Sequence, residues 1–234
     1  MRIARRAIAV WLLWGALLTP APTRASTIST FDSDAEGWFV QDIDPADFSP
    51  AGTYPVTWFP TGGNPDGHIY AQDPSSFAFM FAAPANFLGD QSTATSISFD
   101  LANDSSAPDT GFVTLVLRTS GEFLVFESGD VPSAAFTTFA IPLAPGPGWS
   151  WFEDGHINGR AATVADFQLI MADLTALLIR GDWSGEVDSS RLDNVYLTPE
   201  PGTAALLIVG LIGIAHARRR HRSAESIRTN VPAP

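Results

Sequence analysis

Between residues 26 and 198 the chain alternates apolar and polar residues over short runs, which Gly, Pro, Asn and Asp residues separate. The runs "SISFDL" (Ser96–Leu101) and "FVTLVLR" (Phe112–Arg118) alternate cleanly, so each would place its apolar side chains on one face of a strand. Turn-forming segments such as "GGNPDG" (Gly62–Gly67) recur between the runs. The pattern predicts an all-β fold, a sandwich or barrel of antiparallel strands.

The predicted strands are Thr27–Phe31, Gly37–Val40, Val56–Phe59, His68–Ala71, Phe77–Phe81, Ser96–Leu101, Gly111–Arg118, Phe123–Glu127, Thr138–Leu143, Leu177–Gly181 and Leu192–Leu197. One short helix is also expected. Thr163 can cap its N-terminus with Asp166 three residues on, close to a capping box, and Phe167 and Ile170 follow at helical spacing. The helix should end near Asp173–Thr175.

The two ends of the chain differ from this body. Residues 1–25 have the pattern of a secretory signal peptide: arginines near the start, the apolar run Ala7–Leu18 and a small residue, Ala25, at the cleavage position. A transmembrane anchor is the alternative, but the apolar run is short beside the ~20 residues that a membrane span needs. We therefore expect an exported protein that passes through the Sec machinery.

Near the other end, the apolar run Ala204–Ala215 would be about 18 Å long as a helix, against ~30 Å for the hydrocarbon core of a bilayer. It is a marginal span, and the arginines after it would stay on the cytoplasmic side. The segment has three parts in order. They are the tripeptide Pro199, Glu200 and Pro201, the apolar run, and an arginine cluster that contains Arg218, Arg219 and Arg220.

This order resembles the PEP-CTERM sorting signal of Gram-negative bacteria. The resemblance implies recognition and cleavage by the membrane enzyme exosortase, transient membrane attachment, and delivery to the cell surface or the exopolysaccharide matrix. The chain departs from the family by running on through residues 223–234. A plain C-terminal anchor is the alternative. The expected organisation is a signal peptide (1–25), one β-sandwich domain (26–198), a sorting segment (199–222) and a short polar tail (223–234).

Charge narrows the function of the body. Of the 25 Asp and Glu residues only Glu200 and Glu225 lie outside residues 26–198, whereas nine of the 13 basic residues do, so the body carries 23 acidic residues against four arginines. Such a surface repels the phosphates of nucleic acids, so we do not expect the body to bind DNA or RNA. The chain contains no cysteine, which excludes disulfides and thiolate metal sites.

Several stretches of the body together resemble the laminin B domain, also called laminin IV type A. They are "TGGNPDGHIYAQD" (Thr61–Asp73), "APANFLGDQS" (Ala83–Ser92), "SISFDL", "ATVADFQLIMADLTALLIRGDW" (Ala162–Trp183) and "LDNVYL" (Leu192–Leu197). The resemblance covers most of residues 31–197. It implies an antiparallel β-sandwich of jelly-roll kind, similar to carbohydrate-binding modules, without catalytic activity.

Catalytic patterns are weak in this body. It contains only two histidines, His68 and His156, and it lacks the G-x-S-x-G motif of esterases. A glycoside hydrolase would need a pair of carboxylates, and the acids flanked by aromatic residues are Glu122, Glu127, Glu153 and Asp154. We expect no catalytic residues and keep glycoside hydrolysis as a minor alternative.

A structural calcium site has better support. In "FDSDAEGW" the acids Asp32, Asp34 and Glu36 alternate, so an extended strand would place them on one face, where they would repel one another without a cation. In the sandwich modules that the chain resembles, first and last strands often lie together and hold calcium. We therefore predict that Asp32, Asp34 and Asp193 bind Ca²⁺. An ordinary acidic turn is the alternative.

Aromatic residues suggest where a glycan could bind. In "GWSWF" Trp149 and Trp151 share one strand face, and a flat pair of this kind suits stacking on sugar rings. Trp58, Trp149 and Trp151 are the predicted platform, although tryptophans more often pack in a core. The expected function is a non-catalytic surface module that binds polysaccharide or another matrix component. A purely structural or protein-adhesion role is the alternative.

Overall fold

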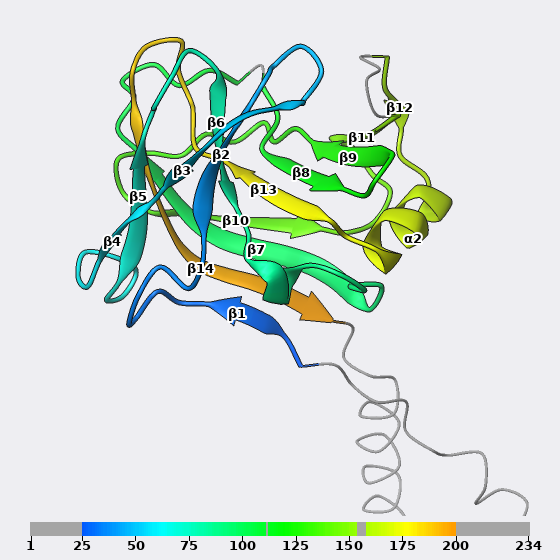
Figure 1. Cartoon of the computed structure of the whole chain (residues 1–234), viewed down its shortest axis with the longest axis horizontal. Helices are drawn as coiled ribbons and strands as arrows, with labels where there is room; N and C mark the ends of the chain where they lie inside the picture. The colour runs from blue at the N-terminus through cyan, green and yellow to red at the C-terminus, as the bar shows by residue number, and fades with distance from the viewer. Residues whose placement is uncertain (1–24, 111, 154–157, 200–234) are drawn as a thin grey trace, which may run out of the picture. The chain divides into compact units, whose positions relative to one another are not determined.

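Two antiparallel β-sheets lie face to face across a shared apolar core (Figure 1). The computed structural model describes residues 25–110, 112–153 and 158–199, which fall within one unit, Ala25–Pro199. All-β antiparallel architecture with one short α-helix was the fold class predicted from the sequence, and it is confirmed.

The first sheet has six strands. Its order is β10 (Thr137–Pro142), β7 (Ala94–Asn103), β14 (Ser189–Pro199), β5 (His68–Gln72) and β4 (Thr57–Phe59), and β1 (Thr27–Ser29) also pairs with β14. Strand β14 changes partner along its length. Residues Ser189–Leu192 pair with β5 and residues Val195–Leu197 with β1, and a bulge between Asp193 and Tyr196 separates the two parts.

The second sheet has eight strands, in the order β12 (Arg160–Ala161), β11 (Trp149–Glu153), β9 (Glu122–Phe126), β8 (Leu115–Arg118), β13 (Ala176–Arg180), β6 (Ala78–Ala82), β2 (Phe39–Ile43) and β3 (Pro50–Pro55). A 3₁₀ turn, η1 (Ala85–Phe87), connects β6 to β7 and so links the two sheets. A helix, α2 (Val164–Ala172), connects β12 to β13 within the eight-stranded sheet.

The alternation in the sequence builds the core. On β7 the side chains of Ile97, Phe99 and Leu101 point between the sheets and have no exposed surface, and those of Phe79 and Phe81 on β6 do the same from the other sheet. Each such side chain contributes roughly 1.5–3 kcal/mol by leaving water. A domain without disulfides therefore holds its sheets together by apolar packing.

Helix α2 starts where the sequence predicted. Thr163 caps it, and the capping box with Asp166 is complete: Thr163 N and Oγ1 each donate to Asp166 Oδ2 at 2.7 Å. Arg160 extends this arrangement, because its Nη1 and Nη2 donate to the two oxygens of Asp166 at 2.6 and 2.7 Å.

Two strands of the structure have no clear signal in the sequence. Strand β3, "PAGTYP", has a proline at each end, lies at the edge of its sheet and is mostly exposed, so it lacks the apolar alternation that marks a strand. Strand β12 contains only Arg160 and Ala161, and its pairing with β11 depends on tertiary structure rather than on local sequence.

The predicted signal peptide and sorting segment lie outside the described residues. Strands β1 and β14 bring the two ends of the described unit together, since Thr27 pairs with Leu197. In the part of the chain that the structure describes, no helix is long and apolar enough to cross a membrane.

Candidate binding face

The eight-stranded sheet carries a second apolar cluster on its outer face, the face turned away from the six-stranded sheet. Its buried members are Ile43, Ala78, Met80, Ala82, Val113, Val116, Phe123, Val125 and Leu178. The sequence signal for this layer is in β6, "AFMFA", in which every residue is buried. A strand that is apolar on both faces needs a cover on both sides.

Partly buried phenylalanines provide that cover: Phe39, Phe48, Phe112 and Phe152, which we call the outer-face phenylalanines. Phe48 comes from the loop between β2 and β3 and reaches across the sheet. Its ring centroid lies 5.3 Å from that of Phe123, 5.9 Å from that of Phe152 and 6.0 Å from that of Phe112. Phe152 stacks on Phe123 at 5.3 Å with an interplanar angle of 5°.

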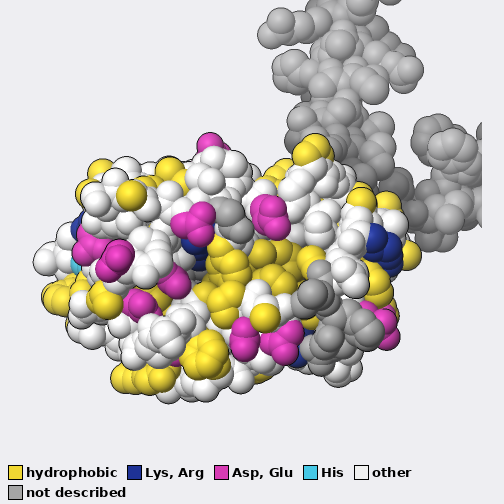
Figure 2. All heavy atoms as spheres, turned by 90° about the horizontal axis from the view of Figure 1, so that it is seen from above, with side chains coloured by type: hydrophobic (Ala, Val, Ile, Leu, Met, Phe, Trp, Pro, Cys, Tyr) yellow, Lys and Arg dark blue, Asp and Glu magenta, His cyan; other side chains and the backbone are white. Residues whose placement is uncertain are grey.

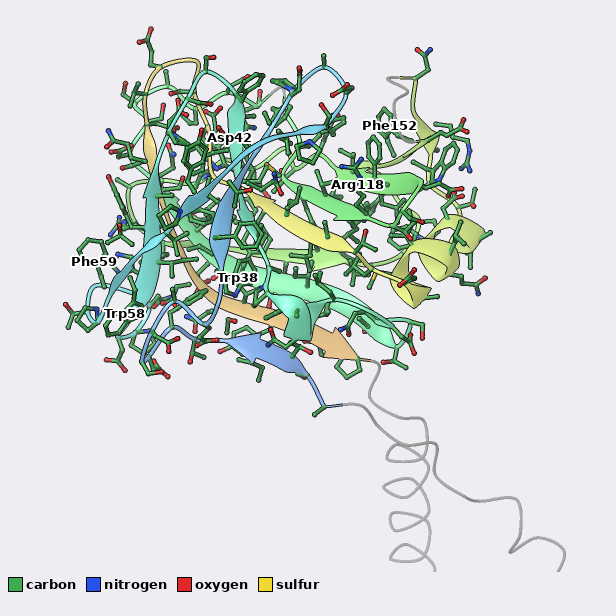
Figure 3. The ribbon with its side chains drawn as sticks, in the orientation of Figure 1. Trp38, Asp42, Trp58, Phe59, Arg118 and Phe152 are labelled. Atoms are coloured by element: carbon green, nitrogen blue, oxygen red, sulfur yellow. The ribbon has the colours of Figure 1, made fainter. Side chains whose placement is uncertain are left out.

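Charged residues surround the phenylalanines. Figure 2 shows hydrophobic side chains gathered in the middle of this face, with Asp and Glu side chains spaced around them. Arg118 and Phe152 both stand on this side of the sheet (Figure 3), and the Arg118 guanidinium lies 6.0 Å from the centre of the Phe123 ring. Hydrogen bonds from Ser49, and to a lesser degree the charge of Arg118, lower the pKa of Asp47 in the β2–β3 loop.

One of the three tryptophans predicted to bind a glycan is buried. Trp149 and Trp151 do share one strand face, but that face points into the core. Trp149 is only 4% exposed, and its Nε1 donates to Pro142 O at 2.9 Å, so the prediction is wrong for Trp149. Trp151 is half-buried, donates to Glu122 Oε2 at 2.8 Å and has the Arg160 guanidinium 4.1 Å above its ring. Trp58 is half-buried and donates to Phe31 O at 2.7 Å.

The acids predicted to bind calcium are engaged in local hydrogen bonds. Asp32 Oδ2 accepts from Thr30 Oγ1 at 2.8 Å, and Asp34 Oδ1 accepts from Glu36 N at 2.6 Å. Asp193 is fully buried, and its two oxygens accept from Asn64 N at 2.5 Å and Asn194 N at 2.7 Å. Among the described residues no three acidic or histidine side chains form a group that could hold a metal ion, and calcium binding by Asp32, Asp34 and Asp193 stays a prediction.

Asp193 anchors the loop Gly62–Gly67. Asp193 lies directly opposite Asp100 of β7, and Asn64 bridges the two: its N–H bonds Asp193, and its Nδ2 donates to Asp100 Oδ2 at 3.1 Å. Gly63 packs so closely that a Cβ there would lie 2.6 Å from Asp193 Oδ2. Burial, together with the charges of Asp100 and Asp32, raises the pKa of Asp193 to about 6.

The structure also shows the positions of residues considered for catalysis. His68 is buried, and Phe59 stacks on its ring at 5.2 Å; burial lowers its pKa. Glu122 lies directly opposite Glu153 across β9 and β11, and it is held by Trp151. His156 and Asp154 lie outside the described residues.

Comparison with known sequences identifies relatives of this domain. Residues 80–201 match the family described as Laminin B (Domain IV). Laminin subunit gamma-1 of Danio rerio is 28% identical over 188 residues, which cover 76% of this chain and 10% of the laminin subunit. The chain thus spans about a tenth of the length of the curated relatives it matches.

Two solved structures superpose on this domain to different degrees. The L4b domain of human laminin alpha-2 superposes with a TM-score of 0.55 at 16% identity, covering 75% of this chain and 98% of that domain. A family 11 carbohydrate-binding module from Clostridium thermocellum, solved with a beta-1,3-1,4-mixed-linked tetrasaccharide, gives a TM-score of 0.48 at 14% identity, covering 74% of this chain and 95% of the module. The likeness to the laminin domain shows a common fold.

Proposed function

The chain belongs to the Laminin B (Domain IV) family, and from that premise we propose that its body is a non-catalytic module that binds polysaccharide or another component of an extracellular matrix. The observation that supports a binding role is the outer face of the eight-stranded sheet. There, half-buried phenylalanines lie over a continuous apolar floor within a ring of acids. Exposed apolar patches bordered by polar residues are typical of ligand-binding surfaces.

Charge decides the class of polysaccharide. The body has 23 acidic residues and four arginines, so it would repel a polymer rich in uronate or sulfate. A neutral polysaccharide avoids that repulsion, and the apolar C–H faces of its sugar rings can pack on phenylalanine rings. We propose a neutral glycan as the ligand, with Phe39 and Phe152 as its stacking residues.

Binding of the full-length chain, purified in detergent, to a panel of neutral and acidic polysaccharides tests this proposal. Saturable binding to a neutral glycan is expected, and Phe39→Ala and Phe152→Ala should each weaken it by roughly tenfold, a loss of about 1.4 kcal/mol. Phe59→Ala is the matched control, because Phe59 is 41% exposed but lies on β4 of the other sheet.

The outcomes separate the alternatives. Equal losses in all three variants would point to a general effect on folding and remove the outer face as the site. Absence of binding to every polysaccharide would leave protein adhesion, the alternative from the sequence, as the account of this domain.

We also propose that the chain is exported through the Sec machinery and sorted by exosortase, on the basis of residues 1–25 and 199–222. Replacing Pro199, Glu200 and Pro201 by alanine should then leave export intact but block processing. The variant would accumulate with its tail uncut in the inner membrane, whereas the unmodified protein would reach the surface or matrix. Immunoblotting of cell fractions would follow the processing of both proteins. Identical processing of the two would rule out this sorting route.

A further inference from the structure

Four aspartates lie on neighbouring segments at one end of the sandwich. Asp42 ends the inward side of β2, Asp73 lies in the loop after β5, and Asp182 and Asp188 lie in the loop between β13 and β14. Figure 1 shows the ends of β2, β5 and β13 at this end of the molecule, and Figure 3 marks Asp42 near the upper end of β2. We call these four residues the end cluster.

Short contacts join the three segments. Ser75 connects two of them, because its Oγ donates to Asp42 Oδ2 at 2.7 Å and its N–H donates to Asp73 Oδ1 at 3.2 Å. The N–H of Asp73 donates to the backbone oxygen of Asp188 at 3.0 Å. Asp188 Oδ2 in turn accepts from Trp183 N at 2.9 Å, which ties it to the β13–β14 loop. The carboxylates are thus held on a fixed framework.

Two oxygens of the end cluster have no hydrogen-bond partner. Asp42 is fully buried and Asp188 is 4% exposed, yet Asp42 Oδ1 and Asp188 Oδ1 accept no hydrogen bond. A buried acceptor without a partner costs about 1–3 kcal/mol, and more when it is charged. Asp193 differs, since each of its oxygens accepts an N–H. The two orphaned oxygens therefore indicate that a positively charged ligand belongs at this end.

Electrostatics point the same way. Burial, then the charges of Asp188 and Asp73, raise the pKa of Asp182 to about 7, and burial and Asp42 raise the pKa of Asp73. The neighbouring cation is Arg180, whose hydrogen bonds go to the backbone oxygens of Asp182, Asp109 and Phe112. The charges that act on Arg180 are those of Asp182, Asp109 and Asp188, so its single positive charge is shared with a carboxylate outside the cluster and leaves the cluster with excess negative charge.

We infer that the end cluster is a binding site for a hard divalent cation such as Ca²⁺, with Asp42 and Asp188 supplying the buried oxygens. Calcium accepts six to eight oxygen ligands in irregular geometry, including backbone oxygens and water. Within residues 25–110, 112–153 and 158–199 no three acids already converge on one point. Binding would therefore draw in Asp73 or Asp182, which are only half-buried.

Calcium binding by the full-length chain in detergent tests this inference without any glycan, so its outcome is independent of the proposed function. The chain would be stripped with EDTA and titrated with CaCl₂ alone, measuring bound ⁴⁵Ca by equilibrium dialysis and the unfolding temperature by calorimetry. We expect saturable binding and an unfolding temperature that rises with calcium. Asp42→Asn and Asp188→Asn should each weaken binding at least tenfold and abolish the rise.

Matched variants keep the test decisive. Asp34→Asn and Asp193→Asn remove carboxylates from the site predicted from the sequence and should leave calcium binding unchanged. Because Asp42→Asn removes a buried negative charge that repels Asp73, this variant should unfold at the same or a higher temperature than the unmodified chain when EDTA is present. A chain that binds no calcium, or one in which Asp193→Asn abolishes binding while Asp42→Asn and Asp188→Asn do not, would overturn the inference.

Discussion

Asp193 on β14 lies directly opposite Asp100 on β7, so two carboxylates face each other across neighbouring antiparallel strands. Like charges in this position destabilise a sheet. Here amide groups compensate: Asn194 Nδ2 donates to Asp100 Oδ2 at 2.9 Å and also to the backbone oxygen of Asn64. Thr138 Oγ1 donates to Asp100 Oδ1 at 2.5 Å. The pair is a structural joint that fixes the loop Gly62–Gly67 over the six-stranded sheet.

Removing Asp193 should loosen that joint. Asp193→Ala leaves the N–H groups of Asn64 and Asn194 without an acceptor, and we expect a loss of about 1–3 kcal/mol in the free energy of unfolding. Asp193→Asn retains one acceptor and relieves the repulsion by Asp100, so it should cost less. Urea unfolding measures both, with the exposed Glu186→Ala as a control. An asparagine variant as unstable as the alanine variant would contradict this account.

Trp149 should matter for stability rather than for binding. Its ring packs edge-on against Phe167 at 5.0 Å and lies 5.1 Å from Phe126, so Trp149→Ala should lower the free energy of unfolding by about 3–5 kcal/mol. Trp151→Ala removes a half-buried ring and should cost about 1–2 kcal/mol. Denaturant titrations measure the free energy of unfolding of the two variants. Equal losses would contradict the conclusion that Trp149 is more deeply buried than Trp151.

Phe48 covers the outer face. Phe48→Ala removes three ring contacts and uncovers Phe123, so we expect a loss of about 2 kcal/mol in the free energy of unfolding. The folded variant should also bind more of a dye that reports exposed apolar surface, such as anilinonaphthalene sulfonate. Phe77→Ala, at a side chain already 39% exposed, should change neither quantity. Unchanged dye fluorescence in Phe48→Ala would show that Phe48 does not cover the apolar floor.

Acid should affect the start of α2 only at low pH. Hydrogen bonds from Arg160, and then those from Thr163, lower the pKa of Asp166 below its usual range. A carboxyl whose folded-state pKa is depressed contributes stability above its unfolded pKa of about 3.9, and that contribution is lost as the pH falls through the folded value.

The measurement compares the urea midpoint of the unmodified chain with that of Asp166→Asn between pH 7 and pH 3. The variant should be less stable by about 1 kcal/mol at neutral pH, a modest value because the Arg160 side chain is 48% exposed. The difference should stay constant down to pH 5 and shrink below about pH 4. A difference that already shrinks between pH 7 and pH 5 would mean that the pKa of Asp166 is not depressed.

Alternation along the chain was sufficient to predict most strands, because a strand with one buried face alternates apolar and polar residues. The run Ser96–Leu101 lies within β7, and the cap at Thr163 starts α2. The same reasoning could not tell which side of a strand faces the core. It placed Trp149 and Trp151 on one face correctly, but only the pairing of β11 with β9 and β12 turns that face inward.

The sequence also does not show that the acids of the end cluster lie near one another. Asp32 and Asp34 attract attention because they are close together in the chain, yet they satisfy their hydrogen bonds locally. Asp42 and Asp188 are far apart in sequence and are linked only through tertiary structure, by Ser75 and Asp73. An unpartnered buried oxygen has no sequence pattern, so the end cluster could not have been predicted.

The pairing of β1 with β14 has a consequence for presentation. Ala25 and Pro199, the two ends of the described unit, emerge beside each other on the side of the six-stranded sheet (Figure 1). The outer-face phenylalanines lie on the opposite side of the sandwich. A long polymer lying across these phenylalanines would therefore stay clear of both ends of the unit.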